Sequence, residues 1–316
     1  MKIKHTTIIS IIAAFFNLLI IIFPKEILSA SKSGLILWFN TVLPSLLPFI
    51  ICTELLVRLD FVRLLGSFLD PLMRKIFRIG GCGSFALISG LFSGYPIGAK
   101  VTCDLYSKDL ISRADALRLL SFSNNSGPLF ILGAVASGML NNTSIGFLLL
   151  FIHYISAFLN GIVFSRIIKG KSHSSAAMPA VADNISFGSA LSSSVSSSAE
   201  TIISIGGYII LFSVIIKLSE LLHLSDTSSV SSNFLLGTVE ITNGCKNLSA
   251  FSDSPFVISM ISALIAWGGF SIHAQTVSFI SKTDLKISLY IFAKFIQAVV
   301  SFILCLFLYP VFIRLP

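Results

Sequence analysis

Charge is what this sequence lacks most. Only 11% of its 316 residues are Asp, Glu, Lys or Arg, whereas soluble domains carry about a quarter. Apolar residues make up 54% of the chain, and several windows reach the ~20 apolar residues needed to cross a bilayer. This balance excludes a water-soluble domain and predicts an all-α integral membrane protein whose main partner is the lipid bilayer.

Metal motifs, cysteine pairs and nucleophile–base pairs are missing as well. The cysteines show no Cys-x-x-Cys spacing, which favours buried small side chains over metal or disulfide roles. Basic and aromatic residues do not interleave as they do on nucleic-acid-binding surfaces, and no polar run holds paired carboxylates. We therefore expect no cofactor, no metal, no nucleic-acid partner and no enzymatic activity. The cysteines are Cys52, Cys82, Cys103, Cys245 and Cys305.

The glycine-rich stretch at residues 93–100 is the most informative segment, and it recurs weakly at residues 267–275. Aligning Gly94 with Gly269 matches the two stretches at one constant offset. Internal repeats that contain glycine-broken helices are typical of secondary transporters. We interpret the two stretches as the tips of two re-entrant hairpins, one in each half of an internal repeat.

The remaining apolar segments predict about six spans. The hairpins are expected because glycine and proline density argues against one straight helix. Residues 192–198 are serine-rich and are expected to be a polar lead-in to the fifth span. The spans cover residues 7–23, 34–57, 116–139, 145–164, 201–222 and 289–311, and the hairpins cover residues 80–106 and 255–279.

These elements divide the chain into four parts. Residues 1–32 form an N-terminal span, for which a retained signal anchor and a cleaved signal peptide are both open. Residues 33–140 form the first repeat, as span, hairpin and span. Residues 141–189 hold an extra span and a cytoplasmic loop, and residues 190–316 form the second repeat.

Positive charge favours an inverted arrangement of the two halves. With re-entrant hairpins, residues 58–78, 108–118 and 166–171 fall on one side together with Arg314, as the positive-inside rule expects of the cytoplasmic face. Few basic residues remain on the other side. Residues 107–118 and 282–286 are therefore predicted to lie on opposite faces. The opposite side keeps Lys25, Lys32, Lys246, Lys282 and Lys286.

Helix ends that meet in mid-membrane expose backbone N–H and carbonyl groups, which suit polar solutes and ions. The candidate substrate- or ion-binding residues lie at the two tips, in the polar octet 121–128 and in the segment before the second hairpin. They are Gly94, Tyr95, Pro96, Gly98, Lys100, Asn124, Asn125, Ser126, Gly127, Glu240, Thr242, Asn243, Gly269, Ser271, His273 and Gln275.

Each candidate has a structural alternative. The tip glycines also suit close helix packing, and the polar octet also suits hydrogen bonds between helices. Lys100 is placed either to bind an anion or to snorkel to the interface. His273 either binds the solute or packs against neighbours, and Glu240 with its neighbours forms either a cation site or a capped loop. Lys294 lies inside a span but near its predicted end, so it is a weak candidate.

Several motifs resemble those of the sporulation integral membrane proteins of the YlbJ family. They are LDPLMR at 69–74, LFSGYPIGAK at 91–100, EITNG at 240–244 and GGFSIHAQ at 268–275. The family belongs to the nucleoside-recognition, or Gate, domain group, whose fold is similar to the core of concentrative nucleoside transporters. The resemblance implies a bacterial multi-pass protein of the mother-cell or forespore membrane that acts in building the spore envelope, including the cortex.

We hypothesise that the protein is a secondary transporter or exporter of a small polar solute, working by alternating access and coupled to H⁺ or Na⁺. The alternative is a non-transporting scaffold or regulator of cortex assembly. The resemblance does not name the solute. A homo-oligomer and sporulation membrane partners are both open.

Overall fold

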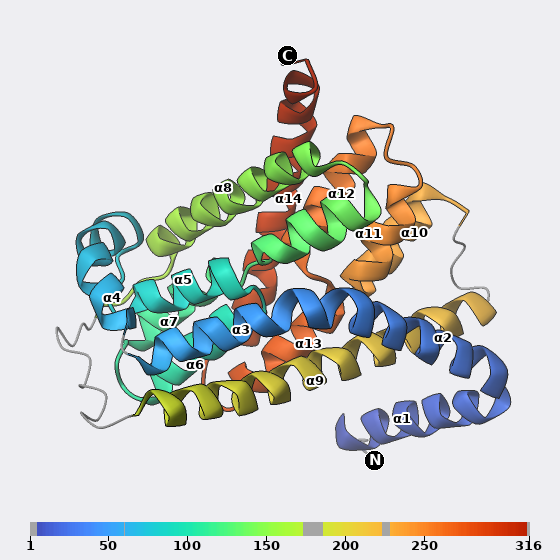
Figure 1. Ribbon diagram of the computed structural model, residues 1–316, viewed down its shortest axis with the longest axis horizontal. Coiled ribbons are helices and arrows are strands. Elements are labelled where there is room, and N and C mark those ends of the chain that lie inside the picture. The colour runs from blue at the N-terminus through green and yellow to red at the C-terminus, as the bar shows by residue number, and fades with distance from the viewer. Residues whose placement is uncertain (1–4, 60, 173–185, 223–227, 315–316) are drawn as a thin grey trace.

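The computed structural model describes residues 5–59, 61–172, 186–222 and 228–314, which are mostly helical (Figure 1). The first half contains α1 (His5–Ile22), α2 (Pro24–Leu37), η1 (Trp38–Val42), α3 (Leu43–Arg58), α4 (Phe61–Leu72), η2 (Met73–Phe77), α5 (Gly83–Ser93), α6 (Ile97–Ser107), α7 (Arg113–Leu120), η3 (Leu129–Met139) and α8 (Thr143–Ile167). The second half contains α9 (Phe187–Leu221), α10 (Val230–Val239), α11 (Ile241–Ser249), α12 (Pro255–Trp267), α13 (Gly269–Ile280) and α14 (Ile287–Phe312).

Four helical segments in the described residues are long and apolar enough to cross a membrane: α8, α9, α12 with α13, and α14. A fifth arises if Ser10–Ile22 and Pro24–Asn40, bent by 102° at their junction, are one span. About six spans were predicted. The count falls because α2, η1 and α3 form one helical run, so the predicted boundary before residue 34 does not exist. The span predicted at 116–139 is also not one helix, because residues 121–128 divide it into α7 and η3.

The spans predicted at 145–164 and 289–311 are confirmed as α8 and α14. The fifth span starts much earlier than predicted, because the serine-rich residues 192–198 belong to α9. Serine is accommodated there by bonding back to the helix: the Ser194 hydroxyl donates to the Ala190 carbonyl at 2.8 Å. Figure 1 shows α9 running along α2 and α3, against which it packs.

Two pairs of short helices form helical hairpins. In the first, α5 and α6 pack side by side and are joined by residues 94–96, within the hairpin predicted at 80–106. A Cβ on Gly90 would lie 3.1 Å from the Cα of Gly98, so only glycine allows this approach. In the second hairpin, which was not predicted, α10 and α11 meet in the same way through Gly237 and Gly244.

The hairpin predicted at 255–279 is wrong. α12 and α13 together form one membrane-length segment, interrupted only at Gly268. Gly268 and Gly269 both have positive φ, 89° and 79°, which breaks the helix but leaves no connecting loop in which the chain could reverse. The segment therefore runs on in one direction and is long enough to cross the membrane, instead of returning to the side it entered.

This crossing also overturns the predicted separation of two loops. Nε of Arg113 lies 2.9 Å from Oδ2 of Asp284, and the Tyr106 hydroxyl donates to Oδ1 of the same carboxylate at 2.7 Å. The segments 107–118 and 282–286 thus meet at one end of the molecule and cannot lie on opposite membrane faces.

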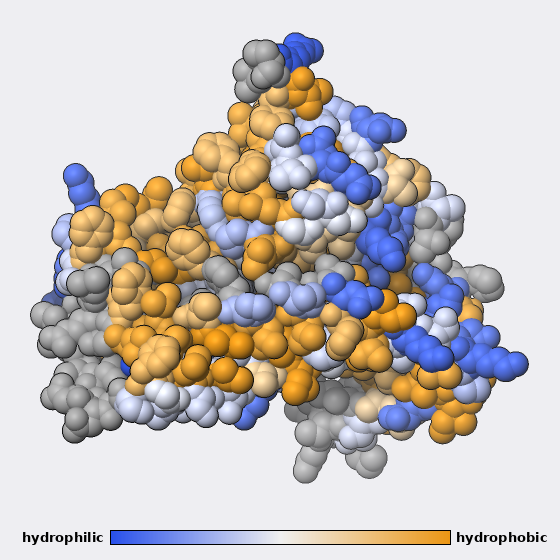
Figure 2. Space-filling view, in the orientation of Figure 1, coloured by the Kyte–Doolittle hydropathy of each residue, from blue (hydrophilic) through white to orange (hydrophobic). Residues whose placement is uncertain are grey.

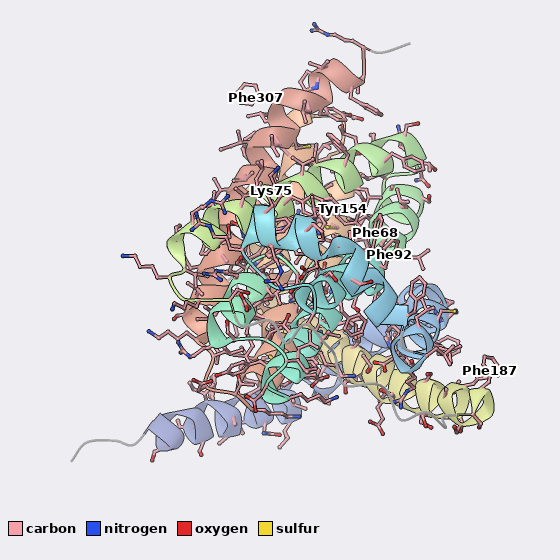
Figure 3. All side chains as sticks on the ribbon, turned by 90° about the vertical axis from the view of Figure 1, so that its left-hand side faces the viewer. Phe68, Lys75, Phe92, Tyr154, Phe187 and Phe307 are labelled. Atoms are coloured by element: carbon pink, nitrogen blue, oxygen red, sulfur yellow. The ribbon has the colours of Figure 1, made fainter. Side chains whose placement is uncertain are left out.

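Apolar side chains cover much of the outer surface. Figure 2 shows them spread over the visible face, with polar residues gathered toward one side and the top of the view. Phe68 is 80% exposed and Phe307 is 71% exposed, and both point away from the helices (Figure 3). Aromatic side chains at such exposure fit contact with lipid and not with water.

Candidate functional site

The first half contains a long helix break that the first hairpin tip covers. α7 ends at Leu120 and η3 begins at Leu129, and residues 121–127 between them are all buried. Gly94 of the tip has φ of 82°, and a Cβ there would come within 2.7 Å of the Gly127 backbone nitrogen. The tip glycine therefore allows the hairpin to rest directly on the broken backbone.

The second half repeats this contact with a shorter break. A Cβ on Gly269 would lie 3.1 Å from the Ile241 nitrogen and 3.2 Å from the Val239 carbonyl oxygen. Residues 239–241 are the tip of the second hairpin, so this tip also rests on a break. The Tyr95 side chain of the first tip packs against the apolar cluster that contains Ile241 of the second tip, so both tips border the same core.

Asn124 connects the first break to α13 and α14. Its Nδ2 donates to the Thr276 hydroxyl at 3.0 Å and to the Tyr290 hydroxyl at 2.9 Å. Nδ1 of His273 lies 3.2 Å from the same Tyr290 hydroxyl. All four side chains are at most 3% exposed, so this network is the polar interior of the molecule.

Lys294 is the buried cation of this network. It is 1% exposed, and its Nζ donates to the Asn124 backbone carbonyl at 3.0 Å and to Oε1 of Gln297 at 2.7 Å. Nε2 of Gln297 in turn donates to Oδ1 of Asn125 at 3.2 Å. Within the described part of the chain no carboxylate pairs with Lys294, which is costly for a buried ammonium and typical of function inside a membrane.

Several polar atoms around this network have no hydrogen-bond partner among the described residues. Nε2 of His153 accepts the Ser126 backbone N–H at 2.9 Å, so the neutral ring carries its proton on Nδ1, which is unpartnered. Buried polar groups are normally satisfied, so these atoms have hydrogen-bonding capacity that the described residues do not fill. Other unpartnered atoms in this region include the Tyr95 hydroxyl, Oδ1 of Asn124, Oγ of Ser126 and Ser271, Nε2 of His273 and Oε1 of Gln275.

The structure brings most of the predicted candidates together but gives some of them structural partners. Glu240 caps α11, accepting from the Thr242 and Asn243 backbone N–H groups at 3.0 and 2.8 Å, which is the predicted capped loop. Lys100 pairs with Glu54 at 3.2 Å, an arrangement that neither of its predicted roles includes. A Cβ on Gly98 would collide with the Ser123 carbonyl, so this glycine serves close packing.

The Asn124 and His273 contacts match the structural alternatives, because both side chains bond between helices. Each also keeps one unpartnered polar atom, which matches the binding alternative. The sequence reasoning missed His153, Thr276, Tyr290 and Gln297 and underrated Lys294. One signal was present: polar residues recur three and four apart along the last span, at 294, 297 and 301.

Among the described residues, no group of three or more His, Cys, Asp or Glu side chains is placed to hold a metal ion. The site's chemistry is therefore that of amides, hydroxyls, imidazoles and one ammonium. Such a set recognises polar groups through hydrogen bonds, and its one basic amine is the buried side chain of Lys294.

Comparison with known proteins agrees with this architecture. Residues 39–140, which hold the first hairpin and the first break, match the family model described as nucleoside recognition (Gate). No solved structure matches the chain. The sporulation integral membrane protein YlbJ of Bacillus subtilis (strain 168) is 36% identical over 335 aligned positions, covering 95% of this chain and 82% of the relative. The chain is therefore an integral, multi-pass membrane protein that belongs to the YlbJ family of sporulation membrane proteins.

Proposed function

We propose that the protein is a secondary transporter or exporter of a small polar solute that serves spore envelope formation. The single observation that carries this proposal is the buried network around Asn124. There, two hairpin tips and two helix breaks converge on polar atoms that lack protein partners. Discontinuous helices at the interface of two repeats are how secondary transporters build their binding sites.

The order of the helices supports an inverted repeat in which the second hairpin is α10–α11, and not residues 255–279 as predicted. Each predicted half contains one hairpin followed by one broken helix: α5–α6 with α7–η3, and α10–α11 with α12–α13. Neither α7 nor η3 is long enough to cross a membrane alone, and we propose that the two together form one crossing. With α8 and α9 this makes three crossings between the hairpins, an odd number that would put the hairpins on opposite faces, so each would close the central site from one side.

The charge distribution fits this topology better than the one first predicted. Lys282 and Lys286 now join Lys108 and Arg113 on one face, and this face becomes more strongly basic. By the positive-inside rule it is the cytoplasmic face. Single cysteines at 108 and 282, in a variant without native cysteines, should both react with an impermeant reagent from the cytoplasmic side only. Labelling from opposite sides would overturn the inverted repeat.

The position of Lys294 decides which coupling ion we propose. Unwound carbonyls and amide oxygens are the groups that coordinate a coupling cation in such transporters. Here the Asn124 carbonyl and Oε1 of Gln297 already accept from the Lys294 ammonium. A tethered cation at this point would repel Na⁺, so we propose coupling to H⁺ instead of Na⁺.

Flux into proteoliposomes, screened over nucleosides and cell-wall precursors with and without a Na⁺ gradient, tests the proposal. We expect flux of at least one solute, with no dependence on the Na⁺ gradient. Asn124→Ala should abolish flux and sporulation function while leaving localisation normal. Glu26→Ala, on α2 and away from the network, is the matched control. A scaffold would show no flux and would tolerate Asn124→Ala.

A further inference from the structure

A basic pocket lies outside the central network, at the end of the molecule where α8 finishes. It has a volume of about 480 Å³, and five of its lining side chains are cationic while none is acidic. These cations come from three separate parts of the chain: the end of η2, the helix α7 and the end of α8. They are Arg74, Arg78, Arg118, Arg166 and Lys169.

Arg118 forms the floor of this pocket and is held rigidly. It is 3% exposed, and its two terminal nitrogens donate to the carbonyls of Arg78, Ile168 and Gly170 at 2.8–3.0 Å. It also pairs with Asp115 at 3.1 Å. Its Nε has no partner among the described residues, so a buried donor remains at a pocket that is already cationic.

The other cations give the pocket an excess of positive charge. Arg74 is paired with Asp70 at 2.6 Å. Arg78, Arg166 and Lys169 have no ion-pair partner in the described part of the chain, and all three are exposed. Guanidinium groups that converge from separate elements match the geometry of phosphate oxygens, which they bind through charge-assisted hydrogen bonds.

The surroundings of the pocket indicate where such a phosphate group comes from. Phe68 and Leu72, on the helix that leads into Arg74, are 80% and 50% exposed. Ile167, next to Arg166, is 59% exposed. An apolar surface beside a basic pocket suits a lipid whose chains lie on the former and whose headgroup enters the latter, and basic pockets on the cytoplasmic side of membrane helices bind anionic headgroups.

We propose that this pocket binds a phosphate group, supplied by an anionic phospholipid headgroup. The binding site is distinct from the central network, because none of its lining residues belongs to that network. It would anchor the ends of α8 and η2 to the charged surface of the membrane, next to the first hairpin.

The full-length protein in detergent micelles provides the test, with lipid binding measured by native mass spectrometry. We expect phosphatidylglycerol and cardiolipin to bind and phosphatidylcholine not to bind. Arg78→Gln combined with Arg166→Gln should weaken binding by at least about tenfold, because charge-assisted hydrogen bonds to the phosphate are lost. Arg118 is left intact because the fold depends on it.

Lys75→Gln combined with Lys108→Gln is the matched control. Both lysines are exposed at the same end, neither lines the pocket, and Lys75 is marked in Figure 3. This variant removes the same charge and should keep binding. Thermal unfolding verifies that both variants are folded. The proposal is overturned if the wild-type protein binds no anionic lipid or phosphate, or if both variants lose binding equally.

A second arm with inorganic phosphate and pyrophosphate separates the two sources of a phosphate group. If these ions bind in the wild-type protein and not in the Arg78 and Arg166 variant, while lipids do not bind, phosphate chemistry is retained and the lipid source is rejected.

Discussion

The two hairpins rest on very different helix breaks. The first tip covers the eight residues of 121–128, where the backbone itself supplies carbonyls such as that of Asn124. The second tip covers one glycine, after which α13 resumes at once. In the second half the polar groups are therefore side chains on an intact helix, such as His273 and Gln275. The first half therefore presents backbone groups whose positions are set by the broken helix. The second half presents side chains, which can adopt different rotamers.

The largest effect is expected where the hairpins pack. Gly98→Ala places a Cβ against the Ser123 backbone carbonyl, which cannot move without disturbing the first break. We expect a loss of about 2–3 kcal/mol of stability. Gly237→Ala meets first the end of the flexible Leu264 side chain, so about 1 kcal/mol is expected. Thermal unfolding in detergent compares the two.

Gly207→Ala is the control for both glycine variants, because nothing lies within 4 Å of a Cβ at that position in α9. Its stability should be unchanged or slightly raised, since alanine favours helix. If Gly98→Ala and Gly237→Ala lose equal stability, the two hairpins pack with the same rigidity. The difference inferred here between the two halves would then be wrong for hairpin packing.

Lys294→Met should lower flux by roughly 10- to 100-fold, the range expected for losing hydrogen bonds from a charged donor. Its stability should be equal to or above that of the wild-type protein, because an unpaired buried charge is removed. Lys217→Met, which breaks a partly exposed pair with Glu220 on α9, is the matched control and should transport normally. Unchanged flux in Lys294→Met would exclude this side chain from the solute and coupling path.

Glu240→Ala tests whether the second tip is a cap or a cation site. Losing the two backbone hydrogen bonds of the cap should cost about 1 kcal/mol of stability, with flux reduced only in proportion to the folded fraction. Glu220→Ala gives the baseline for a partly exposed carboxylate that caps no helix. A stable Glu240→Ala protein that has lost flux would favour the cation site instead.

The sequence predicted the membrane class, both glycine breaks and the polar octet, because apolar length, glycine and mid-span polarity are local signals. It misplaced the second hairpin because α11 carries polar residues such as Glu240, Asn243 and Lys246, and its helical approach to α10 depends on Gly237 and Gly244 meeting in space. Hydropathy does not register such a contact, so the segment was interpreted as a loop.

The centre of the site was predicted only in part, for a related reason. Asn124 and His273 lie beside helix breaks that the sequence reveals through its glycine and polar residues. Lys294 is only seven residues into α14, roughly 10 Å along the helix, which suggests a position near the interface. Its depth comes from the first break and α8 packing around the start of α14, and His153 enters the site only through that packing. Both are long-range effects that one sequence does not show.

The smallest effect is expected at the contact that joins the two halves on one face. The hydrogen bond from Tyr106 and the neighbouring Arg113 lower the pKa of Asp284 below its ordinary 3.8. A lowered carboxyl pKa stabilises the folded state above the unfolded value and loses that contribution as pH falls through the lowered one. Because the side chains are exposed, Asp284→Asn should reduce the midpoint of thermal unfolding only slightly at neutral pH. The difference from the wild-type protein should shrink as the pH falls below the ordinary pKa of 3.8 and vanish once the pH is below the lowered pKa. A difference that grows in acid would mean that Asp284 is protonated in the folded protein, and Arg113 would then not hold the two loops together.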